Sequence, residues 1–378
     1  MINRPRTILQ LLPKLDTGGA ERVVIEIADG LRAAGHKCLI AAQPGPLLGA
    51  AARTGAQIVP LALDTKSPLA IRRNAGRIAR VIAAHKVDLV HAHSRAPAWS
   101  GYWAARAQKI PFVTTYHGTY SEASGLKRRY NAIMARGDRV IAVSDYIAGL
   151  IRARYGTGDD RLRVILGGVD LIKFDPAAVV GDRVTRMGRD WRVSMGEPTI
   201  MLPGRLTSWK GQSLLIAALA KLSHREAIVV LAGDAQGRDA YVGQLLAQAA
   251  QLGVSDRLRL AGHHEDMPAA MMLADIVVNA STDPEAFGRV IVEAQAMGRI
   301  VIAADHGGAR ETIIPGETGF LFSPGDAQAL AAAIDTALVM TPENRLEWAQ
   351  RARAHVAAHY SLAAMQADTL AVYAELLG

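Results

Sequence analysis

Short apolar runs alternate with longer amphipathic stretches along most of this 378-residue chain, and this alternation is what most constrains its fold. The first half carries the pattern from TILQLL to DRVIAVS, and the second half resumes it at TIMLPGRL. Apolar runs separated by helical patterns are typical of βαβ units around a parallel sheet. The sequence therefore predicts an α/β fold with two doubly wound, Rossmann-like domains.

A stretch rich in Gly, Pro and scattered charge separates the two halves, and it fits a linker followed by a helix. The chain is also too long for one ordinary hydrophobic core. We predict an N-terminal domain over residues 1–175, a second domain over 176–358, and a final apolar-periodic helix over 359–378.

Cysteine content and hydropathy favour a cytoplasmic protein. Cys38 is the one cysteine, which excludes an internal disulfide and suits a reducing compartment. The apolar run near the N-terminus is stopped by Pro13 and Lys14, so it is too short for a signal sequence. We expect no membrane-spanning segment, because no window supplies about 18 uncharged apolar residues.

Charge is distributed unevenly between the halves. Residues 1–175 hold 26 Lys and Arg against 13 Asp and Glu, and residues 176–378 hold 17 against 22. A half with net charge +13 favours an anionic partner. We favour a membrane surface over nucleic acid, because no zinc finger, aromatic RNP-type strand or Lys-rich tail accompanies the charge. A nucleic-acid-binding protein without enzymatic activity stays an alternative.

Two glutamates mark the polar strand-end loops of the second half, where ligands of open parallel sheets bind. Glu285 precedes a helix that we expect to start at Phe287 or Gly288, and Glu293 lies about 8 Å further along the helix axis. Such a pair suits the two ends of an elongated ligand whose anionic middle rests on the helix N-terminus. A nucleotide-sugar has this shape.

Cations for a diphosphate precede the glutamates. Arg205 and Lys210 follow a predicted strand, and they combine a planar bidentate donor with a point charge. No Asp-x-Asp pair occurs in the chain, so the usual carboxylate site for a catalytic Mg²⁺ or Mn²⁺ is missing. We therefore expect no metal and no cofactor, with the nucleotide-sugar as a substrate.

Together these motifs resemble the retaining glycosyltransferases of family four, which have the two-domain GT-B fold. The resemblance extends from the TGGAE loop (17–21) through the His-Gly at 117–118 to the glutamate pair in its E-A-F-G context. It implies two Rossmann-like domains facing across a cleft, with the donor bound by the second domain. It also implies that the final helix crosses back to the first domain.

The resemblance assigns roles to individual residues. His117 would contact the donor sugar at the reaction centre, and Arg205 and Lys210 would hold the leaving diphosphate. Glu285 would hold sugar hydroxyls, and Glu293 would accept both ribose hydroxyls. Further donor-binding positions are Gly204, Gly233, Asp234, His263, Phe287, Gly288, Arg289 and Val290, and the acceptor loop holds Gly18, Gly19 and Glu21.

Other positions are less specific. The family more often has an aliphatic residue where Arg289 stands, which leaves the donor sugar open. Gly307 and Gly308 allow a close backbone approach. We expect His91 and His93 to point to opposite faces of a strand, which disfavours a metal pair.

The expected reaction is a retaining transfer of a hexose from UDP to a hydroxyl group. A sugar-nucleotide epimerase or a sugar phosphorylase on the same fold is the alternative. Residues 126–139 carry five basic residues beside a helical apolar stripe, and residues 71–80 add four arginines. This pattern favours an interfacial helix, an anionic membrane surface and a lipid-linked acceptor such as a lipopolysaccharide core. Alternatively, both stripes pack on the sheet and the arginines are solvated.

Overall fold

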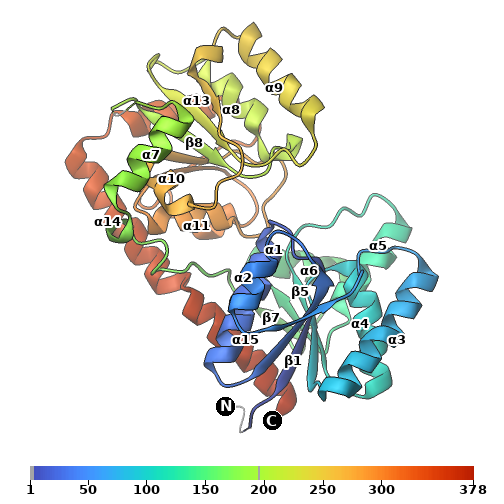
Figure 1. Ribbon diagram of the computed structural model, residues 1–378. Coiled ribbons are helices and arrows are strands. Elements are labelled where there is room, and N and C mark those ends of the chain that lie inside the picture. Colours follow the sequence, from blue (N-terminus) through green and yellow to red (C-terminus); the bar gives the residue numbers. More distant parts are fainter. Residues whose placement is uncertain (1–3, 195) are drawn as a thin grey trace. The chain divides into compact units, whose positions relative to one another are not determined.

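The chain forms two compact units in the computed structural model, which describes residues 4–194 and 196–378 (Figure 1). Unit 1 comprises Met1–Gly168 with Leu362–Gly378, and unit 2 comprises Val169–Ser361. The sequence-based borders at residues 175 and 358 each differ from the observed borders, at residues 168 and 361, by a few residues. The prediction of two doubly wound parallel sheets is confirmed, because each unit contains one.

Unit 1 is built on a seven-stranded sheet in the order β3-β2-β1-β4-β5-β6-β7, with parallel neighbours throughout. The strand order reverses between β1 and β4, so the loops after these strands flank a switch point. The strands are β1 (Thr7–Lys14), β2 (Lys37–Gln43), β3 (Gln57–Pro60), β4 (Leu89–Ala92), β5 (Phe112–Tyr116), β6 (Arg139–Ala142) and β7 (Leu162–Val164).

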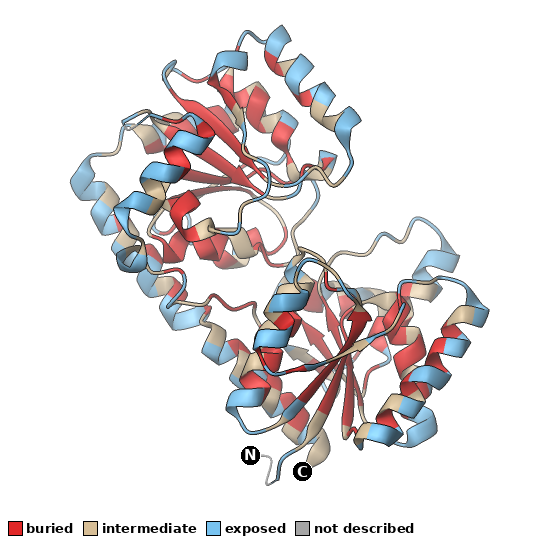
Figure 2. Cartoon of the chain, in the orientation of Figure 1, coloured by how far each residue is buried: buried red, intermediate tan, exposed pale blue. Residues whose placement is uncertain are grey.

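The helices around this sheet bury apolar residues to different extents. They are α1 (Gly19–Ala33), α2 (Leu48–Arg53), α3 (Pro68–His85), α4 (Arg95–Gln108), α5 (Gly125–Asn131), α6 (Asp145–Tyr155) and α15 (Leu362–Leu377). The central strands are buried, the edge strands β3 and β7 are partly exposed, and the outer helix faces are exposed (Figure 2).

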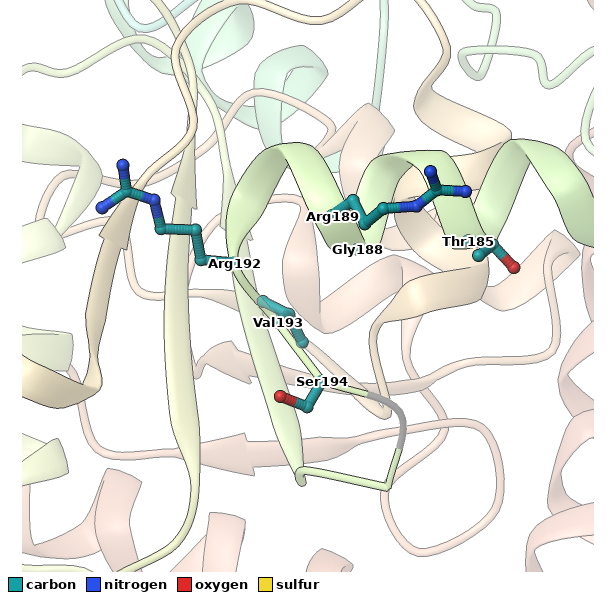
Figure 3. Close-up of a pocket in the computed structure, with 6 residues that line it drawn as sticks. All are labelled: Thr185, Gly188, Arg189, Arg192, Val193 and Ser194. Atoms are coloured by element: carbon teal, nitrogen blue, oxygen red, sulfur yellow. The ribbon is translucent and has the colours of Figure 1, made fainter.

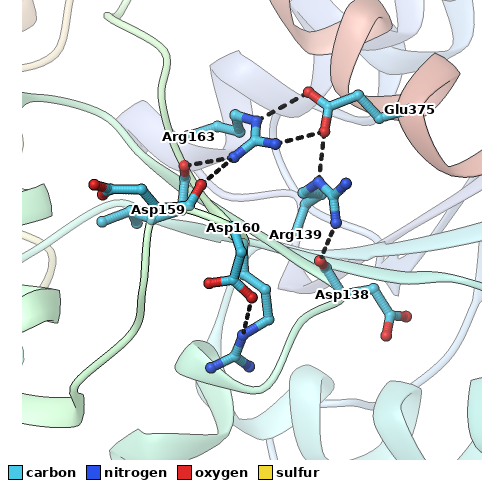
Figure 4. A network of polar contacts seen from close by, with 8 residues as sticks. Asp138, Arg139, Asp159, Asp160, Arg163 and Glu375 are labelled. Carbon is cyan, nitrogen blue, oxygen red and sulfur yellow. Dashed lines mark hydrogen bonds and ion pairs between the residues drawn. The ribbon is translucent and has the colours of Figure 1, made fainter.

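The C-terminal helix α15 is part of the unit 1 core and lies beside α1 (Figure 1). Its Met365, Val372 and Tyr373 join the buried cluster of β1, β2 and α1. Glu375 accepts hydrogen bonds from Arg163 Nε at 2.9 Å and Arg139 Nε at 2.5 Å (Figure 4). The last seventeen residues therefore fold with the first 168, from which they are distant in sequence.

Unit 2 contains a six-stranded parallel sheet in the order β10-β9-β8-β11-β12-β13, with its switch point between β8 and β11. The strands are β8 (Thr199–Pro203), β9 (Ile228–Ala232), β10 (Leu258–Leu260), β11 (Ile276–Asn279), β12 (Ile300–Ala304) and β13 (Phe320–Phe322). The helices are α7 (Gly181–Trp191), α8 (Gln212–Leu219), α9 (Asp239–Gln251), α10 (Met267–Leu273), α11 (Arg289–Ala296), α12 (Ala309–Thr312), α13 (Ala327–Leu338) and α14 (Pro342–His359).

The long interfacial helix expected over residues 126–139 is wrong. Helix α5 ends at Asn131, a 3₁₀ turn follows over Ala132–Ala135, and β6 begins at Arg139. Ile133 and Met134 are 0% exposed, whereas Leu126 is 82% exposed. The apolar residues therefore do not form one exposed stripe, because the sheet core takes up two of them.

The expectation for the two neighbouring histidines is also wrong. Residues two positions apart on a strand share a face. His91 and His93 are both buried, and their ring centroids are 4.0 Å apart.

No helix among residues 4–194 and 196–378 is long and apolar enough to cross a membrane.

Candidate active site

The loops after β8 and β11 meet at the switch point of unit 2. Lys210 Nζ lies 2.5 Å from Glu285 Oε1 and forms an ion pair with it. Ser281 Oγ donates to the same carboxylate oxygen at 2.6 Å. The structure thus brings together two of the predicted catalytic residues, which are 75 positions apart in sequence.

The environment of Glu285 keeps its carboxyl group ionised. Burial would raise its pKa, but the charge of Lys210 and hydrogen bonds from Lys210, Ser281 and Asn279 outweigh burial and lower it. Lys210 Nζ also lies 4.4 Å from the centroid of the Trp209 ring. The site therefore places a carboxylate and an ammonium group side by side, each fixed by contacts with neighbouring side chains.

Glycines let the strand-end loops of unit 2 approach one another closely. A Cβ on Gly233 would lie 1.9 Å from the carbonyl oxygen of Gly204, and a Cβ on Gly211 would lie 1.9 Å from that of Ala280. Real side chains never approach backbone so closely. The backbone of the loop after β8 is therefore in direct contact with the backbone of the loops after β9 and β11.

The loop after β12 supports the glutamate loop in the same way. The Gly308 amide donates to the Glu285 carbonyl at 2.9 Å. A Cβ on Gly307 would lie 2.4 Å from that same oxygen. His306 Nε2 donates to the Ser281 carbonyl at 2.8 Å, since a carbonyl can only accept. The close backbone approach predicted for the two glycines is thus made to the Glu285 segment.

Helix α11 begins beside this cluster. Gly288 is its N-cap residue with φ +86°, and glycine has no side chain that could cap that end. Glu293 lies one turn further on, is 5% exposed, and has its Oε1 3.6 Å from Arg289 Nε. Phe287 is buried and packs edge-on against Tyr360 at 5.7 Å between ring centroids. Val290 is half-buried.

Arg205 differs from Lys210 in having no acidic partner among the described residues. It is exposed directly after Gly204, whose φ of +145° favours glycine. Asp234 is also exposed, and its Oδ1 accepts from the Gln236 amide at 2.8 Å, which closes a turn. An exposed guanidinium beside a paired ammonium can receive an anion without first breaking an ion pair.

The loop after β10 is held by α7. Arg183 makes two hydrogen bonds to Asp266, at 2.5 and 2.8 Å. Trp191 Nε1 donates to His264 Nε2 at 2.8 Å, while His263 is exposed.

The predicted residues of unit 1 also lie at carboxyl ends of strands. Gly18 is the N-cap of α1, and Gly19 and Glu21 form its first turn after β1. A Cβ on Gly18 would lie 2.1 Å from Glu21 Oε2, so the carboxylate folds back over the helix start. His117 follows β5, is half-buried, and has its Nε2 3.0 Å from His93 Nδ1.

A hollow of about 420 Å³ lies at the end of α7, lined by Thr185, Gly188, Arg189, Arg192, Val193 and Ser194 (Figure 3). Its two arginine side chains point in different directions, and none of the predicted site residues lines it. This hollow is therefore separate from the candidate site.

Sequence reasoning missed Ser281, Asn279 and His306, which hold the Glu285 carboxylate and its loop. The signal available was their position at the end of β11 and in the polar stretches after β11 and β12. It identifies the loops, but not which side chain orients which.

Comparisons with known proteins cover both units. Residues 17–173 match the family described as Glycosyltransferase Family 4, and residues 186–355 match Glycosyl transferases group 1. A phosphatidyl-myo-inositol mannosyltransferase of Mycolicibacterium smegmatis is 30% identical over 388 residues, 96% of this chain and 91% of that protein.

Solved structures agree. A glycosyltransferase from Rickettsia africae has a TM-score of 0.90 and 35% identity, with 99% of both chains covered. The Anabaena protein HepE in complex with UDP-glucose has a TM-score of 0.87 and 27% identity, over 98% of this chain and 100% of that one. With matches of this extent over both units, the chain belongs to glycosyltransferase family four and has the GT-B fold.

Proposed function

We propose that this glycosyltransferase moves a hexose from UDP, with retention of configuration, onto a hydroxyl group of a lipid-linked saccharide. The observation that carries the proposal is the contact of Lys210 with Glu285 beside the glycine-capped start of α11. It combines a cation and helix N–H groups for a diphosphate with a carboxylate for sugar hydroxyls. The likeness to a protein solved with UDP-glucose supports UDP as the nucleotide.

A same-face displacement suits these residues better than a covalent intermediate. Glu285 Oε1 is occupied by Lys210 and Ser281, so this carboxylate suits hydrogen bonding to the sugar rather than nucleophilic attack. The departing phosphate would take the proton of the acceptor hydroxyl. Arg205, Lys210 and the N–H groups of α11 would stabilise the charge on the phosphate as it develops. His117 would contact the donor sugar from unit 1.

Arg205→Ala tests the diphosphate assignment. Loss of one hydrogen-bonding cation at a developing charge costs roughly 10²-fold in kcat/KM. Arg225→Ala is a matched control, because Arg225 is an exposed arginine before β9, at the opposite end of that strand from the site loops. An Arg205→Ala variant within about threefold of the control would contradict the assignment.

The nucleotide is tested by thermal unfolding with UDP-, GDP- and ADP-hexoses. A ligand present at 100 times its Kd stabilises the folded state by about 2.7 kcal/mol. We expect the UDP-hexose to raise the melting temperature most, and a larger shift with another base would contradict the choice of UDP.

A membrane surface is the proposed location of the acceptor, on the cytoplasmic face. Lys127, Arg128 and Arg129 of α5 are all exposed, and so is the adjacent Leu126. The arginines of α3 are exposed as well, while its Ile71, Ile78 and Ile82 pack inward. One relative is named a phosphatidyl-myo-inositol mannosyltransferase, which supports a lipid-linked acceptor.

Vesicle flotation tests this part. Each Lys or Arg near an anionic surface is worth about 1 kcal/mol, so changing Lys127, Arg128 and Arg129 together to Gln should weaken vesicle binding roughly 100-fold at low salt. Lys221, Arg225 and Arg238 of unit 2, all exposed, changed together to Gln remove the same charge and serve as the control. Absence of flotation in the parent protein at any salt concentration would favour a soluble acceptor.

A further inference from the structure

A chain of buried polar side chains connects the centre of the unit 1 sheet to His117. Gln10 lies in the middle of β1 and is 0% exposed, and His93 follows β4 and is 2% exposed. His93 Nε2 lies 3.1 Å from Gln10 Oε1, and His93 Nδ1 lies 3.0 Å from His117 Nε2. His93 therefore contacts both partners, one through each ring nitrogen.

One obligate acceptor determines where the protons in this chain lie. The Val24 carbonyl can only accept, and it lies 2.9 Å from Gln10 Nε2, which also reaches Cys38 Sγ at 3.3 Å. The amide nitrogen of Gln10 must face this side, so Oε1 faces His93. Since Oε1 can only accept, His93 Nε2 must carry the hydrogen.

His93 is neutral in this setting. Burial, together with the nearby His91 and His117, keeps its pKa well below the ordinary value. A neutral imidazole has one donor and one acceptor nitrogen. Because Nε2 is the donor, Nδ1 carries the lone pair and accepts from His117 Nε2–H.

We propose that His93, oriented by Gln10, is a positioning residue that holds His117 as the Nε2–H tautomer, so that His117 Nδ1 accepts a hydrogen bond from a sugar hydroxyl. The assignment of the tautomer depends only on contacts within unit 1. The role toward the sugar rests on the proposed function. A hydroxyl that donates its one hydrogen to His117 can only accept hydrogen bonds from other groups, which makes this tautomer a determinant of sugar specificity.

His91 offers a control within the same buried layer. Its Nδ1 lies 2.7 Å from the Tyr373 hydroxyl, and its Nε2 lies 2.7 Å from the Thr115 hydroxyl. Tyr373→Phe removes a buried histidine hydrogen bond beside His93 without removing any member of the Gln10–His93–His117 chain.

Nitrogen NMR on the full chain tests the proposal. In protein labelled with ¹⁵N-histidine, long-range ¹H–¹⁵N spectra distinguish a protonated ring nitrogen from one carrying a lone pair. At a pH of about 8, where an ordinary histidine is neutral, we expect Nε2 to be protonated and Nδ1 to be unprotonated on both His93 and His117. A protonated Nδ1 on His117 in the parent protein overturns the proposal.

Variants separate positioning from simple stability. His93→Leu removes the acceptor for His117, and Gln10→Met removes the acceptor for His93 while keeping the ring. We expect the His117 signals of both variants to change to a tautomer mixture, with kcat/KM falling roughly tenfold, the equivalent of one lost hydrogen bond. Tyr373→Phe should leave the His117 signals and kcat/KM unchanged.

The NMR measurement and the kinetic measurement test different parts of the proposal. The NMR measurement needs no substrate, so unchanged His117 signals in folded His93→Leu and Gln10→Met overturn the positioning role whatever the reaction is. Changed signals with an unchanged kcat/KM overturn the contact between His117 and the sugar.

Discussion

Gly307 is a position where one added methyl group should disturb the candidate active site strongly. Its φ is +60°, and a Cβ there would lie 2.4 Å from the Glu285 carbonyl oxygen and 2.9 Å from the Glu285 nitrogen. Ordinary contact begins at 3.4 Å. Gly307→Ala must therefore separate the loop after β12 from the Glu285 segment by about 1 Å, because both opposing atoms are backbone.

The cost has a conformational part and a packing part. A positive φ costs a non-glycine residue about 1 kcal/mol, and overpacking costs about 1–3 kcal/mol more. For a unit of this size each kcal/mol lowers the melting temperature by about 2–4 °C, so we expect a decrease of roughly 4–16 °C. A displacement of about 1 Å in a group that positions substrate can cost about 10²-fold in rate.

Gly316→Ala isolates the conformational part. Gly316 also has a positive φ, +79°, but no described atom lies within 4 Å of a Cβ placed there. We expect a loss of about 1 kcal/mol and an unchanged kcat/KM for this variant. The assays are thermal unfolding and steady-state kinetics with UDP-hexose. If the two variants had equal melting temperatures and equal kcat/KM, the close approach to Glu285 would not constrain the site.

Three further predictions concern stability and metal dependence. Hydrogen bonds from Arg163 and Arg139, opposed by burial, hold the pKa of Glu375 below its ordinary value, so its stabilisation is present at neutral pH and lost as pH falls through the lowered pKa. Glu375→Gln should cost about 1 kcal/mol at pH 7, and a difference from the parent that did not shrink as the pH is lowered would contradict this. In a chain that ends at Ser361, unit 1 should be unfolded and digested in limited proteolysis, whereas unit 2 should resist. The reason is that core residues of α15 are lost, each of which contributes about 2–5 kcal/mol. A protease-resistant unit 1 would refute this prediction. Transferase activity should be undiminished in excess EDTA, and a complete loss restored by Mn²⁺ would show a metal requirement.

The sequence was sufficient for the central strands and insufficient for three edge strands. The predicted run TILQLL lies within β1, because a central strand is buried on both faces and reads as near-continuous apolar sequence. β3, β7 and β13 were not predicted. Each lies at a sheet edge, has three or four residues and is partly exposed, so its pattern does not stand out from a loop.

From the sequence alone, Arg205, Lys210 and Glu285 were predicted to bind a diphosphate and a sugar, since they lie in strand-end loops, and Glu293 was predicted from its spacing to Glu285. Only the tertiary structure decided that Lys210 is paired with Glu285, while no acidic side chain in the described part of the chain pairs with Arg205. The same holds for His91 in β4 and His93 directly after it, since neither the close approach of their rings nor the contact of His93 with His117 was predicted. The reason is that a strand-end motif is local, whereas these contacts join residues 24 to 75 positions apart through the strand order of a folded sheet.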